Sequence, residues 1–130
     1  MKKPSMLFGA MMWIAMVGIA AANDVAAAVE NLSTALLAGD ESRIRALFDL
    51  DSGGYAYSLD GELHTGARFA QWLDRDIIAT GRVFVIDTIA VEGRRAMVEA
   101  TYGIGTPTSF RRYAFEVDEA GLLVAWRIEH

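Results

Sequence analysis

The sequence has no cysteine, and it has few prolines and lysines, with two of each among 130 residues. Without cysteine, disulfide bonds, thiolate metal sites and a bacterial lipoprotein anchor are excluded, so the fold depends on its apolar core alone. Both lysines and one proline lie within the first four residues. No internal repeat, low-complexity segment or linker follows residue 22. A chain of this kind and length is typical of a single domain.

The first 22 residues differ in composition from the rest. Lys2 and Lys3 precede an uncharged apolar run of 17 residues, Met6 to Ala22, which ends in three alanines. A basic start, an apolar run and a small-residue cleavage site indicate a secretory signal peptide, here residues 1–22. A bilayer span requires roughly 17 to 25 residues, so an uncleaved N-terminal anchor is the alternative. We predict an exported protein, periplasmic or secreted, whose mature domain (residues 23–130) has no membrane partner after cleavage.

The predicted mature domain is strongly acidic. Both lysines leave with residues 1–22, so ten arginines remain against 17 acidic residues. The net charge changes from −5 for the whole chain to −7 for the mature domain. Because a negative surface repels phosphate backbones, this charge argues against a nucleic-acid partner.

Helical spacing dominates the first part of the mature domain. A first helix is predicted from about Val25 to Leu37, with Asp24 as its N-cap. Its apolar stripe consists of Val25, Ala28, Val29, Leu32 and Leu36. Gly39 suits the left-handed conformation that ends a helix, and Asp40 is predicted to cap the next one. Gly39-Asp40 is therefore interpreted as a corner between two helices.

Two further helices are predicted by the same spacing, the second of them starting at Thr65 or Gly66. Their buried faces are Ile44, Leu47 and Phe48 in one, and Phe69, Trp72, Leu73 and Ile77 in the other. Between these helices, "YAYSL" and "ELHTG" flank Asp60-Gly61, a two-residue turn that predicts a small hairpin.

Strand patterns occupy the rest of the chain. Runs with alternating apolar residues predict strands at 82–91, 94–102, 110–117 and 122–130. Helices first and an antiparallel meander second indicate the α+β class. We expect a cone-shaped, curved antiparallel sheet with about three N-terminal helices packed on its concave face. Such a sheet encloses a pocket lined by apolar side chains and a few polar ones.

Three segments resemble the nuclear transport factor 2-like superfamily, which includes SnoaL-like polyketide cyclases and ketosteroid isomerase. They are "LLAGDESRIRALFD", "DGELHTGARFAQWL" and "YAFEVDEAGLLVAWRIEH". The first is similar to the family's helix corner, the second to its hairpin and third helix, and the third to its final hairpin. The resemblance covers nearly all of the mature chain. It implies the fold and says little about activity, because this fold carries many functions.

The catalytic residues of ketosteroid isomerase do not carry over to this chain. By position, Leu32 replaces the tyrosine, Ala56 replaces the aspartate base, and Tyr113 replaces the late aspartate. Leu32 and Ala56 cannot ionise or donate, and Tyr113 has no base partner in the expected place. The Asp-Arg-Asp arrangement of epoxide hydrolases in the wider family also lacks a third member beside Asp87 and Arg111.

Nine residues are candidates for lining the pocket, several of them aromatic because aromatic side chains line pockets in this kind of fold. They are Tyr55, Tyr57, Phe69, Trp72, Asp87, Tyr102, Arg111, Tyr113 and Trp126. Asp87 shares a face with Val85 and Ile89 by alternation, so it is either a buried base with a raised pKa or a solvated surface carboxylate.

Arg111 is the second polar candidate of interest. By alternation Arg111 joins Tyr113 and Phe115 on one face of a strand, while Arg112 faces the other way. Arg111 either binds an anionic or carbonyl ligand or forms a surface ion pair with Glu99 or Glu129.

The two histidines, His64 and His130, could join Asp60 or Glu62 at a metal ion. Their spacing matches no known ligand pattern, so we predict surface histidines, no metal and no cofactor.

One functional hypothesis leads and two alternatives remain. The first is an exported, SnoaL-like protein that binds a small apolar or amphipathic ligand. The second is an isomerase, cyclase or hydratase, with Asp87 as base and Tyr113 or Arg111 as electrophilic partner. The third is an interaction module of the cell envelope. The resemblance implies a homodimer formed through the outer face of the sheet, since family members often dimerise that way.

Overall fold

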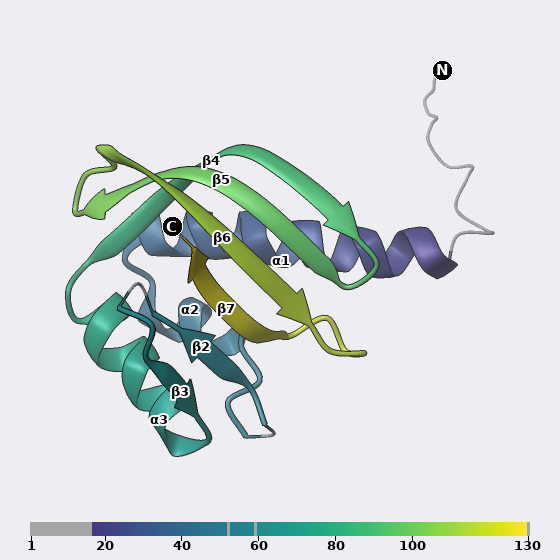
Figure 1. Ribbon diagram of the computed structural model, residues 1–130, viewed down its shortest axis with the longest axis horizontal. Coiled ribbons are helices and arrows are strands. Elements are labelled where there is room, and N and C mark those ends of the chain that lie inside the picture. The colour runs from purple at the N-terminus through teal and green to yellow at the C-terminus, as the bar shows by residue number, and fades with distance from the viewer. Residues whose placement is uncertain (1–16, 52, 59, 130) are drawn as a thin grey trace.

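The computed structural model describes residues 17–51, 53–58 and 60–129 (Figure 1). The helices are α1 (Val17–Ala38), α2 (Glu41–Ala46) and α3 (Ala67–Trp72), and α3 continues as a π-helical turn, η1 (Leu73–Ile78). The strands are β2 (Tyr55–Tyr57), β3 (Leu63–Thr65), β4 (Arg82–Glu92), β5 (Arg95–Ile104), β6 (Ser109–Val117) and β7 (Leu123–Glu129). The predicted α+β class is confirmed.

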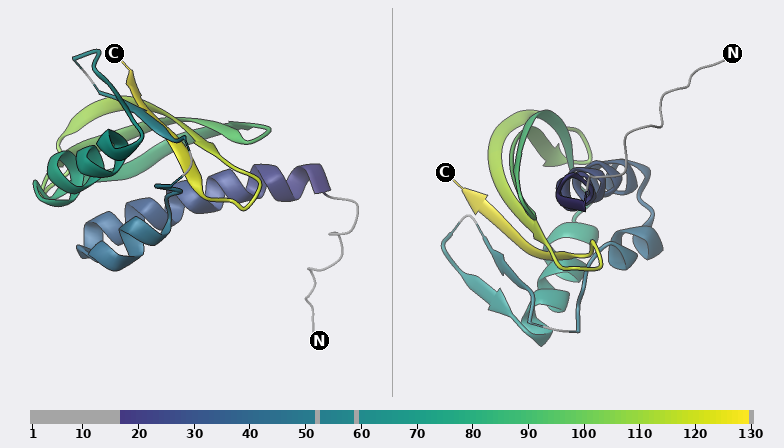
Figure 2. Two further views of the ribbon diagram at one scale, coloured as in Figure 1. Left: turned by 90° about the horizontal axis from the view of Figure 1, so that it is seen from below. Right: turned by 90° about the vertical axis from the view of Figure 1, so that its right-hand side faces the viewer.

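The six strands form one curled sheet in the order β3-β2-β7-β6-β5-β4. Neighbouring strands are antiparallel except β2 and β7, which run parallel, so the expectation of a wholly antiparallel sheet is corrected at this one pairing. No tight turn joins β2 to β7, so only the tertiary fold sets their relative direction. Figure 2 shows the sheet curving around the helices, with α1 lying along the β4–β6 part and α3 near β2 and β3.

Helix α1 buries the predicted apolar stripe, with Val25, Val29 and Leu32 fully enclosed. The helix begins at Val17, so Asp24 lies inside it and the expected N-cap at this residue is wrong. The helix therefore runs through the expected cleavage position after Ala22, and the signal peptide remains a prediction. No helix in the described part of the chain is long and apolar enough to cross a membrane.

The corner at Gly39-Asp40 is confirmed. Gly39 has a φ of 68°, a left-handed conformation that glycine adopts without steric penalty. The Asp40 carboxylate accepts a hydrogen bond of 3.2 Å from the backbone N–H of Arg43, which caps α2. These residues redirect the chain and lie outside the pocket described below.

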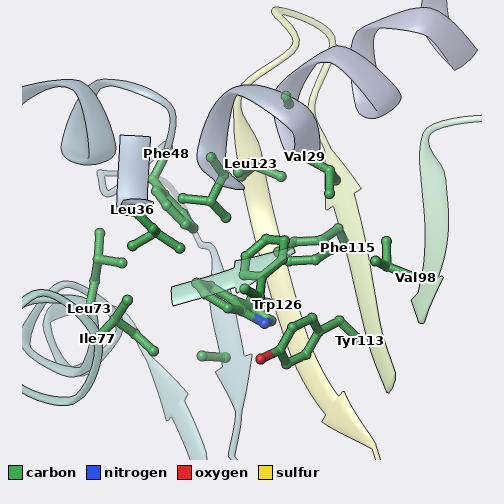
Figure 3. Close-up of a cluster of buried hydrophobic side chains, with 14 of the residues drawn as sticks. Val29, Leu36, Phe48, Leu73, Ile77, Val98, Tyr113, Phe115, Leu123 and Trp126 are labelled. Atoms are coloured by element: carbon green, nitrogen blue, oxygen red, sulfur yellow. The ribbon is translucent and has the colours of Figure 1, made fainter. Parts of the chain in front are cut away.

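An aromatic cluster fills the deep part of the concave face (Figure 3). It comprises Phe48, Phe84, Tyr113, Phe115 and Trp126, all at most 4% exposed. The Trp126 ring lies 5.1 Å from Phe115, 5.5 Å from Tyr113 and 5.9 Å from Phe84, between ring centroids. Trp72 of α3 closes the cluster with an edge contact of 5.3 Å to Trp126. Edge-to-face pairs of this kind stabilise a core beyond the area they bury.

The edge strand β4 is covered by α1. The hydroxyl of Ser33 on α1 donates a buried hydrogen bond of 2.6 Å to the carbonyl of Phe84. This bond satisfies a carbonyl group at the sheet edge and fixes α1 against β4, the side of the sheet that carries Arg82.

Candidate functional site

A pocket of about 480 Å³ opens between the concave face of the sheet and the helix α3–η1, in the range of small-molecule sites. One side, here called the sheet side, consists of Arg82, Tyr102, Arg111, Tyr113 and Ile128. The other is here called the helix side. Its residues are Trp72 of α3, Asp76 of η1, Thr80 just after η1, and Ser58, Asp60 and Glu62 around the β2–β3 turn. The aromatic cluster is the floor beneath the pocket, because Tyr113 belongs to both.

Tyr113 places a hydroxyl group at the floor of the pocket. Its side chain is 1% exposed, and the hydroxyl has no hydrogen-bond partner among the described residues. Burial raises the pKa of Tyr113 to about 12, although Arg82 and Arg111 act in the opposite direction. The phenol therefore stays protonated at neutral pH and can donate a hydrogen bond to a ligand.

Arg111 is held in place on the sheet side by Tyr102. Its Nη2 donates a 2.7 Å hydrogen bond to the Tyr102 hydroxyl, and its guanidinium carbon lies 4.4 Å from the centroid of the Tyr102 ring. A guanidinium stacked on an aromatic ring keeps its remaining N–H groups available for a planar anion. The guanidinium carbon of Arg82 lies 5.9 Å from the centroid of the same Tyr102 ring.

Three buried nitrogen and oxygen atoms lack hydrogen-bond partners within the described part of the chain: Arg82 Nε, Tyr113 Oη and Trp126 Nε1. All three can donate, and Arg82 and Tyr113 line the pocket directly. Figure 3 shows the Tyr113 hydroxyl and the Trp126 indole nitrogen on the same side of the aromatic cluster. A buried donor without a partner lowers the stability of the fold by about 1–3 kcal/mol. A ligand that brings an acceptor to such donors in a pocket would recover this free energy.

The helix side carries carboxylates. The Ser58 hydroxyl (2.6 Å) and the backbone N–H of Glu62 (3.1 Å) donate to Asp60 and hold the pKa of this carboxyl below its usual range. Asp76 is half-buried in η1. The Asp60 carboxyl is therefore ionised at neutral pH. Asp76 and Glu62 lie with it on the helix side of the pocket, and the two arginines lie on the sheet side.

Ser58, Asp60 and His64 lie together but do not form a nucleophilic triad. Ser58 donates to Asp60 and lies 3.4 Å from His64 Nε2, so the carboxylate binds the serine and not the histidine ring, as a triad would require. His64 is half-buried, stacked on Trp72 at 6.1 Å, which differs from the surface position expected. In the described residues no group of three His, Asp or Glu side chains could hold a metal ion, and His130 lies outside them.

Four of the nine predicted pocket residues come together in the pocket: Trp72, Tyr102, Arg111 and Tyr113. The choice of Arg111 over Arg112 agrees with the structure, because Arg112 instead pairs with Glu99 on the outer face at 3.4 Å. Phe69 and Trp126 are core residues, 1% and 0% exposed, and do not line the pocket.

Tyr55 and Tyr57 also lie outside the pocket, so their expected place in it is corrected. Tyr55 borders a smaller hollow of about 300 Å³ on the outer face, and Tyr57 lies beneath the guanidinium of Arg127, at 5.3 Å. Both belong to β2, whose pairing with β7 turns these side chains away from the concave face.

Of the two alternatives for Asp87, the structure agrees with the solvated surface carboxylate, so its expected place in the pocket is wrong. Asp87 is the extra residue of a β-bulge, since Ile86 pairs with Ala100 and Thr88 with the adjacent Glu99. Its carboxylate is exposed and accepts a 2.9 Å hydrogen bond from Thr101. The bulge also breaks the alternation that placed Asp87 and Ile89 on one face, so a base at Asp87 finds no support.

Sequence reasoning missed several residues that line the pocket, and Arg82 and Asp76 are the charged ones that it proposed for no site. Arg82 begins β4 and lies two residues before the buried Phe84. Residues two apart in a strand share a face, so this spacing could have indicated that Arg82 lies on the concave face. Asp76 lies one residue before the buried Ile77, and no sequence pattern distinguishes it from the exposed Asp74.

The positions that ketosteroid isomerase uses for catalysis are apolar core here. Leu32 and Ala56 are both 0% exposed. Tyr113 is the one position of this set that reaches the pocket.

Similarity to solved structures establishes the fold of this chain. Neither protein-family models nor the sequences of curated proteins match this chain. A nuclear transport factor 2-like protein of unknown function from Cytophaga hutchinsonii superposes with a TM-score of 0.68 at 10% identity, over 81% of this chain and 88% of that one. The chain therefore has the nuclear transport factor 2-like fold.

Two further structures with this fold come from Mycobacterium tuberculosis. An LEH-like epoxide hydrolase is 23% identical, with 82% of both chains covered and a TM-score of 0.64. Rv0760c, in complex with estradiol-17beta-hemisuccinate, is 14% identical over 82% of this chain and 93% of its own, with a TM-score of 0.62. Similarity at this level defines the architecture and leaves the chemistry to the pocket.

Proposed function

We propose that the protein binds a small molecule in this pocket, with an acceptor oxygen of the ligand against Tyr113, Arg82 and Arg111. One observation carries the proposal: two buried donors that have no partner among the described residues, Tyr113 Oη and Arg82 Nε, line an open pocket. A carboxylate or a carbonyl oxygen satisfies both donors, and the guanidinium of Arg111 favours the charged form.

The ligand is amphipathic rather than wholly apolar. The deep apolar part of the concave face is occupied by the aromatic cluster, so the remaining space is bordered by polar groups as well as by Trp72 and Ile128. The steroid hemisuccinate bound by Rv0760c is a small molecule with a carboxylate, which supports this class of ligand for a pocket in the same fold.

Binding is favoured over catalysis. Asp87 lies outside the pocket, and the isomerase positions at Leu32 and Ala56 are buried hydrocarbon. Tyr113 and Arg111 supply electrophilic groups without a carboxylate or histidine base in hydrogen-bond contact with either, within the described residues. Export and pairing of two copies through the exposed Val85, Met97 and Phe110 of the outer face remain part of the proposal. Cell fractionation and sedimentation velocity test these two points.

Titration with 4-methylbenzoate, followed by NMR on isotope-labelled protein, tests the binding proposal. We expect shift changes centred on Tyr102, Arg111 and Tyr113. In Tyr113→Phe the affinity should fall by about tenfold to a hundredfold, since a hydrogen bond to a charged group contributes about 1.5–3 kcal/mol. Tyr55→Phe is the matched control, because Tyr55 lies on the outer face, and it should bind like the unmodified protein.

Two results would contradict the proposal. One is an unchanged affinity in Tyr113→Phe with the fold intact. The other is a set of shift changes confined to the hollow beside Tyr55, which would place the ligand on the outer face.

A further inference from the structure

The two sides of the pocket carry opposite charge. Both cations, Arg82 and Arg111, belong to strands of the sheet side. All three carboxylates, Asp60, Asp76 and Glu62, belong to the helix side. The sequence separates these groups, and the fold brings them to face one another across a single space.

The opposite charges do not neutralise one another. In the described part of the chain, neither arginine has a carboxylate within salt-bridge distance; Arg111 binds the Tyr102 hydroxyl and the carbonyl of Phe110. Asp60 binds Ser58 and the backbone of Glu62, and the Asp76 carboxylate has no hydrogen bond or ion pair with another described residue. The pocket thus keeps a positive and a negative side, each available to a ligand.

The two sides also differ in depth. On the positive side Tyr113 is 1% exposed, and its hydroxyl, which has no partner among the described residues, lines the pocket. Arg82, Arg111 and Asp76 are half-buried, whereas Asp60 and Glu62 are exposed at the β2–β3 turn. A charge at the buried end interacts more strongly than one at the exposed end, because water screens the latter. An anionic group therefore belongs at the floor and a cationic group at the rim.

We propose that the ligand is amphoteric: a small molecule with a carboxylate at one end, against Arg82, Arg111 and Tyr113, and a protonated amine at the other, against Asp76 and the β2–β3 turn. This inference rests on the proposed function and names the ligand class for the same pocket. Trp72 and Ile128 also line the pocket and supply an apolar surface for the body of the molecule.

A matched series of three probes tests the inference: 4-(aminomethyl)benzoate, 4-methylbenzoate and 4-methylbenzylamine. They share one ring and differ in which charged ends they carry. By isothermal titration calorimetry we expect 4-(aminomethyl)benzoate to bind about threefold to fivefold tighter than 4-methylbenzoate, since a partly exposed ion pair contributes up to about 1 kcal/mol. 4-Methylbenzylamine should bind weakest, because it leaves the buried donors unmatched.

Asp76→Asn should abolish the advantage of the amine, and it should raise the affinity for 4-methylbenzoate slightly, because it removes a negative charge from the pocket. Asp74→Asn is the matched control, since Asp74 lies two residues away, outside the pocket, and binds Arg45 at 3.0 Å. The control should keep the full advantage of 4-(aminomethyl)benzoate.

Each other outcome has a distinct meaning. If 4-methylbenzoate binds at Tyr113 and the amine adds nothing, the amphoteric ligand is overturned and the proposed function stands. If the amine's advantage persists in Asp76→Asn, the assignment of the cationic end to this side is overturned. If none of the three probes binds, the inference and the proposed function both fail.

Discussion

The concave face of the sheet has two parts that are built in opposite ways. We call the part filled by the aromatic cluster the deep end, and the part that borders the pocket the mouth. At the deep end, Phe115 and Trp126 are fully buried with their rings 5.1 Å apart. At the mouth, Arg82 and Tyr113 keep donors without partners in the described residues beside a pocket of about 480 Å³. Close-packed rings stabilise the fold, whereas unpartnered donors lower its stability and create a binding site. The comparison assigns stability to one end of the face and ligand recognition to the other.

The largest expected effect comes from breaking the deep end. Phe115→Ala removes a ring that contacts Trp126, Phe84 and Tyr113, so the free energy of unfolding should fall by about 3–5 kcal/mol in urea titrations. Arg111→Gln at the mouth should change it by less than about 1 kcal/mol. Equal decreases in the free energy of unfolding in the two variants would refute the assignment of stability to the deep end.

If Phe115→Ala does not fold, a variant that keeps more of the side-chain volume still tests the prediction. Phe115→Leu should lose about 1 kcal/mol, still more than a polar substitution at the mouth with no packing role.

Tyr113 belongs to both ends, and it should make the free energy of unfolding depend on pH in the alkaline range. Its folded pKa of about 12 exceeds the ordinary value of 10.0, so the unfolded chain loses the phenolic proton first as pH rises. This contribution is fully present below pH 10 and is lost as pH rises to about 12, a decrease on the order of 2 to 3 kcal/mol.

Unfolding curves measured across this pH range check the prediction, with Tyr113→Phe as the reference. The decrease should be absent from the variant, apart from what other groups contribute. Parallel pH profiles for the two proteins would show that the Tyr113 hydroxyl is solvated in the native state.

The smallest expected effect lies outside both ends, at the corner between α1 and α2. Asp40→Ala removes the carboxylate that caps α2 and should lower the free energy of unfolding by about 1 kcal/mol. Affinity for 4-methylbenzoate should stay the same, because Asp40 does not line the pocket. A loss of affinity in this variant would mean that general stability, rather than the mouth, controls binding.

Much of the fold was predictable because its signals are local. The stripe with Val25 and Leu32, the turn at Gly39-Asp40 and the hairpin at Asp60-Gly61 each depend on residues close in sequence. The register within the meander was less predictable. The bulge at Asp87 leaves its carboxylate on the outer face beside Thr101 and returns Ile89 to the core, and alternation alone gives no sign of an extra residue.

The sequence by itself determined the elements, the apolar faces and the absence of an isomerase's tyrosine and aspartate at Leu32 and Ala56. Only the tertiary structure decided that Arg82, Arg111 and Tyr113 from two strands meet Asp76 across one pocket. The physical reason is the range of the interactions. Periodicity records which face of an element is buried, whereas the partner of that face depends on how distant elements pack, as the parallel pairing of β2 with β7 shows.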